Sequence, residues 1–209
     1  MNLAIIGAGN VGRSLAIASV RAGHSVVVAS ADLEDAEGVA QVAGARAVAS
    51  NRDAVGAADV VILAIPTDKL VAVATDLRAE LSGKIVIDVT NRPTPDASGN
   101  ATSMAEELQA AIPDATVVKA FNTAFASRQV DPIVEGVALD GYVAADDPAA
   151  RATVLELVRS IGFRPIDAGS LAVSRTLEGM AWLNISLQLQ NGWPWQSGWK
   201  LVGPTTAAA

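Results

Sequence analysis

The sequence predicts an α/β fold in which a mainly parallel sheet is covered by helices on both faces. Short runs rich in Val and Ile alternate with helical patterns from one end of the chain to the other, as is typical of parallel sheets. A glycine-rich turn at residues 7–12 joins the first apolar run, residues 3–6, to the first helical pattern. With a second strand at residues 25–30, this unit has the order and length of a dinucleotide-binding unit. We therefore expect a doubly wound fold of the Rossmann type.

Apolar spacing predicts the other elements of the first half. A helix is expected near residues 32–42 and strands at 46–49, 59–65 and 84–89. Residues 59–65 are apolar at almost every position, as in strands that are buried on both faces. The helix before residues 84–89 carries apolar residues at helical spacing: Leu70, Val73, Leu77 and Leu81.

The second half repeats this alternation of strands and helices. Strands are predicted at residues 116–120, 142–145 and 163–168. Asp147 begins a helix with Pro148 in its first turn, and Gly162 ends it. Asp is a favoured N-cap, Pro suits the first turn, and Gly suits the position after the last turn.

The last segment of the chain has a different character. Ser170 can cap a helix that runs to about Leu189 and is apolar on most sides, so this helix should pack against two surfaces. All four tryptophans lie in this last segment. We therefore divide the chain into a Rossmann part, residues 1–169, and a C-terminal helix with a Trp-rich tail, residues 170–209. The second part is expected to join two subunits of a homodimer or to complete the substrate site.

Composition argues against several classes of function. The net charge of -7 leaves no basic patch for nucleic acid. Without cysteine, the chain offers no disulfide, thiolate nucleophile or cysteine metal cluster, and we expect no metal site. No basic leader and no bilayer-length apolar run is present, so we expect a cytoplasmic protein without a membrane partner.

The glycine turn has the chemistry of a phosphate site. Gly7 permits a tight turn after the strand, Gly9 lets the backbone approach a pyrophosphate, and Gly12 lets the helix pack on its strand. Asn10 and Val11 lie at the helix N-terminus, where free N–H groups attract phosphate. These five residues are predicted to bind the cofactor; the alternative is a close-packed turn without a ligand.

Ser30 ends the second strand at the position that selects between NAD and NADP. An acidic residue there would bind the ribose 2′-OH and repel a 2′-phosphate, whereas a small hydroxyl suits the phosphate. Ala31 offers no charge, and Asp32 could take the acidic role after a small shift of the loop. Arg13 and Arg46 are candidate phosphate ligands, or else solvated surface charges. The sequence favours NADP and leaves NAD open.

Two further strand ends should border the cofactor, because ligands of open α/β sheets bind beyond the carboxyl ends of the strands. Ala64, Ile65 and Pro66 place flat apolar backbone there, unless Pro66 only begins the next helix. Asn91 adds an amide after the fifth strand, beside the guanidinium of Arg92.

The sixth strand ends in the candidate catalytic residues. Asn122 is predicted to align the nicotinamide by bonding its carboxamide or ribose, with a loop cap as the alternative. Ala120, two residues earlier, is predicted to contact the cofactor. Lys119 is a candidate for catalysis, unless its side chain snorkels from the edge of the strand.

Other acid–base groups are few. His24 lies in a turn at the far end of the sheet, and Arg175 and Glu178 are spaced to form an ion pair on the last helix. No buried carboxylate pair is evident. Hydride transfer between two carbon atoms needs alignment and exclusion of water more than a strong base, so these residues fit that reaction.

Six motifs along the chain occur together in one known family. They are the turn at residues 7–12, Ser30, residues 64–66, residues 88–93, Lys119-Ala120-Phe121-Asn122-Thr123 and Asp167-Ala168-Gly169-Ser170-Leu171. In these motifs, which span nearly the whole chain, the sequence resembles the NADPH-dependent coenzyme F420 reductase family. The resemblance implies a small Rossmann protein, dimeric through its C-terminal part, that passes hydride between NADPH and the 5-deazaflavin coenzyme F420.

The resemblance also implies where the two molecules bind. It implies NADP contacts at Gly9, Asn10, Val11, Ser30, Ile65 and Asn122. The deazaflavin would lie over the nicotinamide, between Asn91, Asn122 and the last helix. Family members usually follow the Ser with an Arg that holds the 2′-phosphate, and this chain has Ala31 instead.

Two other functions fit the same residues. The enzyme alternative is an NAD(P)H-dependent reductase of imines, small carbonyl compounds or ferric chelates, since members of this family include the cytosolic domains of membrane metalloreductases. Reduction of a carbonyl would favour a proton donor, for which Lys119 is the candidate. The alternative of another class is a redox sensor that binds the dinucleotide without catalysis.

Overall fold

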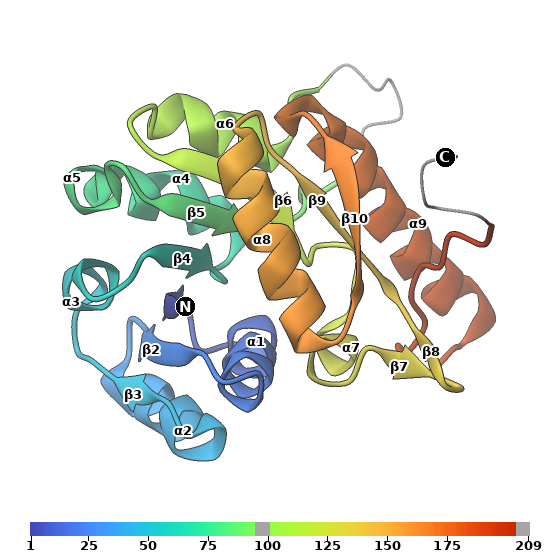
Figure 1. Cartoon of the computed structure of the whole chain (residues 1–209), viewed down its shortest axis with the longest axis horizontal. Coiled ribbons are helices and arrows are strands. Elements are labelled where there is room, and N and C mark those ends of the chain that lie inside the picture. Colours follow the sequence, from blue (N-terminus) through green and yellow to red (C-terminus); the bar gives the residue numbers. More distant parts are fainter. Residues whose placement is uncertain (95–100, 204–209) are drawn as a thin grey trace.

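The computed structural model describes residues 1–94 and 101–203, and within them an eight-stranded sheet forms the centre of the molecule (Figure 1). The strand order is β10-β9-β6-β5-β4-β1-β2-β3. The strands are β1 (Asn2–Ile6), β2 (Ser25–Ala29), β3 (Arg46–Ala47), β4 (Val60–Leu63), β5 (Ile85–Asp88), β6 (Thr116–Ala120), β9 (Asp140–Ala144) and β10 (Arg164–Gly169). The first six are parallel, whereas β9 pairs antiparallel with β6 and parallel with β10. The predicted doubly wound, mainly parallel sheet is confirmed.

Helices cover both faces of the sheet because its strands alternate their apolar side chains between two cores. On β1, Ile5 belongs to one core and Ile6 to the other, and on β4 the same holds for Ile62 and Leu63. The first core lies under α1 (Asn10–Arg21), α2 (Leu33–Ala43) and α8 (Pro148–Ile161). The second lies under α3 (Asn51–Gly56), α4 (Thr67–Asp76), α5 (Arg78–Leu81) and α6 (Met104–Ala111).

Two helices differ from the sequence prediction. The stripe from Leu70 to Leu81 belongs to two helices, α4 and α5, which meet at the buried Leu77. Ser170 does not begin the last helix, because a single 3-10 turn, η1 (Leu171–Val173), precedes α9 (Ser174–Asn191).

The buried face of α9 is largely polar, contrary to the expectation of a helix packed through apolar sides. Its buried residues recur at helical spacing: Ser174, Leu177, Glu178, Ala181, Asn184 and Gln188. Leu183 and Leu189 are instead exposed, at 52% and 70%. The helix therefore brings polar groups to the carboxyl ends of β5 and β6.

The Trp-rich tail folds back on its own chain. The Trp195 ring packs edge-to-face on Phe125, 5.4 Å between centroids, just before α7 (Ala126–Val130). The Trp199 carbonyl accepts a hydrogen bond of 2.9 Å from the Asp140 N–H of β9. A short hairpin of β7 (Ile133–Val134) and β8 (Val137–Ala138) lies beside the tail (Figure 1). Residues 204–209, the end of the predicted tail, lie outside the described residues.

None of the helices in the described part of the chain combines the length and the apolar character that a membrane span requires.

Candidate active site

The glycine turn is fixed by close backbone contacts at two of its glycines and open at the third. Gly7 has φ +114, and a Cβ there would come within 2.2 Å of the Ala64 carbonyl oxygen. A Cβ on Gly12 would lie 1.9 Å from the Gly7 oxygen. No heavy atom lies within 4 Å of a Cβ built on Gly9, which borders a cavity. The turn therefore leaves room for a ligand at Gly9 only.

A cavity of about 410 Å³ lies at the carboxyl ends of β1, β2 and β4. It brings together three separately predicted groups: the glycine turn, Ser30 and residues 64–66. Its lining residues are Ile6, Gly7, Ala8, Gly9, Ser30, Ala31, Asn51, Ala64, Ile65, Pro66, Lys69 and Val73. Apolar walls beside the glycine turn would suit the adenosine part of a dinucleotide, and we use the name adenosine cavity for this space.

Lys69 of α4 is the charged residue among those lining this cavity. Asp32, the candidate acidic residue for NAD, is committed elsewhere: its Oδ1 accepts a hydrogen bond of 2.9 Å from the Glu34 N–H and caps α2. Ser30 and Lys69 thus line the same cavity, and no carboxylate is among its lining residues. Lys69 Nζ lies 3.5 Å from Asp68 Oδ2, an ion pair at the surface.

The other two candidate cations do not line the adenosine cavity. Arg46 lines a different cavity together with His24, at the amino end of β2, and Arg13 is absent from the lining of the adenosine cavity. His24 lies in the predicted turn, with Nε2 2.7 Å from Ser160 Oγ. Burial and the nearby N-terminal ammonium group lower its pKa.

A second cavity of about 160 Å³ lies between α1, the ends of β5 and β6, and α9. Its lining residues are Val11, Val89, Asn91, Phe121, Asn122, Thr123, Ala124, Phe125, Ala126, Gln129, Ala181, Asn184 and Ile185. None of these side chains is an acid or a base in the pH range of enzymes. We call this space the amide cavity, because four of its polar side chains are amides.

Asn122, the predicted nicotinamide ligand, lines the amide cavity, and its amide is held in one orientation. Its Nδ2 donates to Asn91 Oδ1 at 2.9 Å and to the Leu177 carbonyl at 3.0 Å. Its Oδ1 is buried and has no hydrogen-bond partner among the described residues. Because buried polar atoms are nearly always paired, this oxygen fits the N–H of a bound carboxamide.

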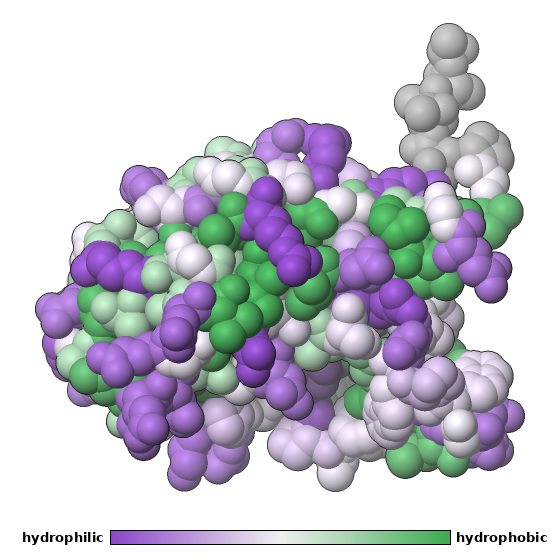
Figure 2. Space-filling model, turned by 90° about the horizontal axis from the view of Figure 1, so that it is seen from below, coloured by the Kyte–Doolittle hydropathy of each residue, from purple (hydrophilic) through white to green (hydrophobic). Residues whose placement is uncertain are grey.

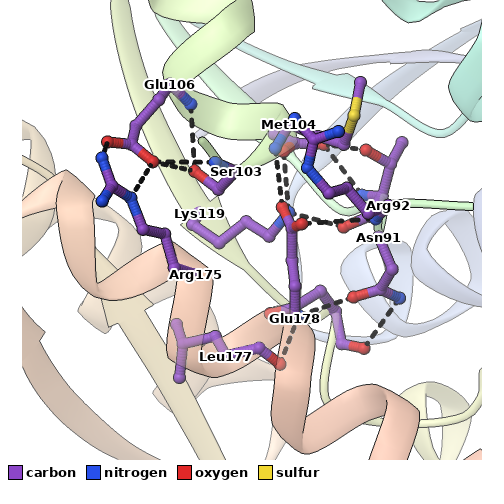
Figure 3. Close-up of polar contacts among 12 residues, drawn as sticks. Asn91, Arg92, Ser103, Met104, Glu106, Lys119, Arg175, Leu177 and Glu178 are labelled. Atoms are coloured by element: carbon purple, nitrogen blue, oxygen red, sulfur yellow. Dashed lines mark hydrogen bonds and ion pairs between the residues drawn. The ribbon is translucent and has the colours of Figure 1, made fainter. Parts of the chain in front are cut away.

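Lys119 lies inside the protein and does not snorkel, contrary to the structural alternative considered from the sequence (Figure 3). Its Nζ donates to Asp88 Oδ2 at 2.8 Å, to Glu178 Oε1 at 2.7 Å and to the Thr90 carbonyl at 2.5 Å. All three ammonium protons are thereby bonded within the protein, and Lys119 lines neither cavity. Asp88 and Glu178 are also a buried carboxylate pair that the sequence did not reveal.

The expected ion pair between Arg175 and Glu178 is wrong. Arg175 instead forms a bidentate pair with Glu106 of α6, at 2.8 and 2.6 Å (Figure 3). The hydrogen bonds from Arg175 outweigh the effect of burial and lower the pKa of Glu106 to about 2. Two separate ion pairs therefore hold α9 in place: Arg175 with Glu106 of α6, and Glu178 with Lys119 of β6.

Ala120, predicted to contact the cofactor, is fully buried in β6 and lines neither cavity. Asn10 begins α1 on the exposed surface, beside Gly9. Gln129 and Asn184 were not predicted as site residues, yet both line the amide cavity.

The chain is similar in sequence and fold to known proteins. The family model described as "NADP oxidoreductase coenzyme F420-dependent" matches residues 2–92. The F420-dependent NADP reductase of Methanothermobacter thermautotrophicus is 31% identical over 211 residues, which cover 91% of this chain and 90% of that protein. The chain belongs to the F420-dependent NADP reductase family. A crystal structure of a putative member of this reductase family from Arthrobacter sp. FB24 superposes with a TM-score of 0.85 at 27% identity, covering 97% of this chain and 100% of that one.

The chain is also similar to part of larger proteins. Metalloreductase STEAP3 of Rattus norvegicus is 34% identical over 194 residues, 90% of this chain. The chain spans only 37% of the length of that metalloreductase. An imine reductase from Bacillus cereus, at 18% identity and a TM-score of 0.67, shares the fold.

Proposed function

We propose that the protein transfers hydride between NADP(H) and a 5-deazaflavin of the coenzyme F420 type. Membership in the F420-dependent NADP reductase family supports this reaction. The two cavities also support it, because they lie at the ends of neighbouring strands: Gly9, just before α1, lines one cavity, and Val11, in the first turn of α1, lines the other. Along this edge of the sheet, the adenosine cavity would hold the adenosine half of one dinucleotide and the amide cavity its nicotinamide half.

Three groups of residues would each bind one part of the dinucleotide. Ser30, Ile65 and Lys69 would surround the adenosine and its 2′-phosphate, and the backbone at Gly9 would receive the pyrophosphate. Asn122 Oδ1 would accept a hydrogen bond from the nicotinamide carboxamide. Lys69 supports NADP over NAD, because a cation in this cavity favours the additional phosphate.

The observation that carries the reaction type is the absence of titratable side chains among the described residues lining the amide cavity. Together the two rings would supply the chemistry, since the hydride leaves nicotinamide C4 with its electron pair, bonds to the deazaflavin C5, and solvent supplies the accompanying proton. The amides and apolar walls can align two flat rings and exclude water. They offer no acid for a carbonyl oxygen, which disfavours carbonyl reduction.

We also propose that the protein is a homodimer formed through α9. Large apolar side chains are exposed on α9 and the neighbouring tail and hairpin: Ile133, Val137, Leu183, Leu189, Trp193, Trp195, Leu201 and Val202. Figure 2 shows separate hydrophobic patches at the right-hand side of the molecule, the side where Figure 1 places β7, β8 and α9. Light scattering should give a dimer for the intact chain and monomers for Leu183→Glu; an intact chain that is monomeric would refute this interface.

Mixing the protein with NADPH and oxidised coenzyme F420 tests the reaction. The deazaflavin absorbance should fall together with that of NADPH. If the deazaflavin absorbance persists while imines, carbonyl compounds or ferric chelates oxidise NADPH, the protein is a different reductase. If NADPH binds and no acceptor oxidises it, the protein is a sensor.

A further inference from the structure

Three amides of the amide cavity each hold one buried polar atom without a partner among the residues that the structure describes. These atoms are Asn122 Oδ1, Gln129 Oε1 and Asn184 Nδ2. Asn122 Oδ1 already has a role in the proposed function. The other two are one acceptor and one donor, and the residues that carry them, Gln129 and Asn184, line the same cavity.

The orientation of the Gln129 amide is fixed by the turn after β6. Its Nε2 donates to the carbonyl oxygens of Phe121 and Ala124, each at 3.3 Å. Since both partners are acceptors, the NH2 must face them and Oε1 must face away. The turn itself is strained, because Phe121 has φ 62, an unusual backbone conformation for an aromatic residue. Gln129 therefore holds a strained turn with one end of its amide and leaves the other end for a ligand.

The orientation of the Asn184 amide is fixed by the C-terminal tail. The Trp195 N–H donates to Gln188 Oε1 at 2.9 Å, so Gln188 Nε2 must be the donor to Asn184 Oδ1, at 3.3 Å. Ser197 Oγ also donates to Asn184 Oδ1, at 2.6 Å. Because Asn184 Oδ1 accepts both of these hydrogen bonds, the Asn184 NH2 group remains as an unused donor among the described residues. The tail thus sets a donor at the cavity wall.

We propose that Gln129 Oε1 and Asn184 Nδ2 bind the amide edge of a flat ring, meaning a C=O group next to an N–H group. The acceptor matches the N–H and the donor matches the C=O, and both protein atoms are preorganised and buried. This inference rests on the proposed function, since both of its co-substrates carry such an edge: the carboxamide of the nicotinamide and the pyrimidinedione of the deazaflavin. A ligand without an amide edge would leave both protein atoms unpaired.

Calorimetric titration of Asn184→Asp tests the inference without measuring turnover. The substitution keeps the shape and the oxygen that accepts from Gln188 and Ser197, but it removes the donor. Asn191→Asp is the matched control, because it adds the same charge to the exposed end of the same helix, where Asn191 Nδ2 donates to the Leu187 carbonyl. Gln129→Met, which removes the acceptor, is the second variant.

Three titrations show which molecule supplies the amide edge. The first uses NADP⁺, and the second uses 2′-phospho-ADP-ribose, which lacks nicotinamide. The third adds oxidised coenzyme F420 to the NADP⁺ complex. Asn184→Asp and Gln129→Met should each weaken the same ligand by about tenfold or more, while 2′-phospho-ADP-ribose binds unchanged. A loss confined to coenzyme F420 assigns the edge to the pyrimidinedione, and a loss for NADP⁺ assigns it to the carboxamide.

Two results would overturn the inference. One is Asn184→Asp binding NADP⁺ and coenzyme F420 within about twofold of the unmodified protein. The other is an equal loss for 2′-phospho-ADP-ribose, which has no nicotinamide to contact these residues. Failure of the proposed function is a separate result, because it is seen as no reduction of coenzyme F420 by the unmodified protein.

Discussion

Lys119 Nζ of β6 and Glu178 Oε1 of α9 lie 2.7 Å apart in the interior of the protein. The same carboxylate oxygen accepts a hydrogen bond of 2.9 Å from the Met104 N–H of α6, and Asp88 contacts the ammonium from the other side. One buried cation therefore joins the sheet to the C-terminal helix. The position of α9 in turn sets the Leu177 carbonyl that orients Asn122.

Lys119→Met should destabilise the fold. It leaves two buried carboxylates without their cation, a change that typically costs about 3–5 kcal/mol of unfolding free energy. Urea unfolding measures the loss. Arg159→Met is the control, because it removes a cation that is 56% exposed and should change stability by less than about 0.5 kcal/mol. A Lys119→Met midpoint equal to that of the unmodified protein would show that the interior ion pairs do not hold α9 in place.

Valine at Gly9 should weaken NADPH binding, whereas valine at Gly12 should destabilise the fold. Gly9→Val should fold, since nothing lies within 4 Å of the added Cβ, but it should lose NADPH affinity because the side chain fills the phosphate position. Gly12→Val should lose stability, because its Cβ would lie 1.9 Å from the Gly7 oxygen. Calorimetry and thermal melts on both variants separate the two roles; tight NADPH binding by Gly9→Val would remove the turn from the site.

Lys69 should select for NADPH over NADH. Lys69→Ala removes a charge-assisted phosphate contact worth about 1.5–3 kcal/mol, or about one to two decades in the NADPH dissociation constant. Ala31→Arg should strengthen NADPH binding by a similar factor. NADH, which has no 2′-phosphate, should respond weakly to both changes. Equal effects on the two cofactors would place Lys69 and Ala31 away from the 2′ position.

Glu106 should make part of the stability depend on pH. Its pKa is lowered from 4.5 to about 2 by hydrogen bonds from Arg175, so the ionised carboxylate favours the folded state. This stabilisation is complete above about pH 4.5 and is lost as the pH falls toward 2. The melting temperature of Glu106→Gln should therefore lie below that of the unmodified protein at pH 7 and approach it in acid. In an Arg175→Met background, a difference that keeps its size would refute the pairing.

Local patterns in the sequence predicted the parts of the site that local chemistry determines. Gly12 is required by its contact with Gly7 inside the strand–turn–helix unit, and Gly7 by its backbone φ of +114 and by the nearby Ala64 carbonyl. The spacing of the two glycines indicated the turn, although not the contact with Ala64. Ser30 and Ile65 follow buried strands, and a parallel sheet brings the carboxyl ends of its strands to one edge. The same rule indicated Asn122, which follows β6 and lines the amide cavity.

Contacts between distant residues could not be predicted in this way. Lys119 and Glu178 are 59 positions apart, and nothing near either residue indicates that they pair. Arg175 and Glu178 are three residues apart, and this spacing favoured an ion pair within the helix. The sequence alone does not reveal that Glu106 of α6 offers Arg175 a bidentate contact. Asn184 and Gln188 did leave a signal: two amides one turn apart on the same helical face as Leu177.

Transfer of deuterium from the C4 position of NADPH tests the central claim most directly. In a mixture of the protein, oxidised coenzyme F420 and NADPH labelled at the transferred position, the deuterium should appear at C5 of the deazaflavin and not in the solvent, because hydride passes directly from carbon to carbon. Deuterium released to water, or a deazaflavin that stays oxidised and unlabelled while NADPH is consumed, would contradict the account.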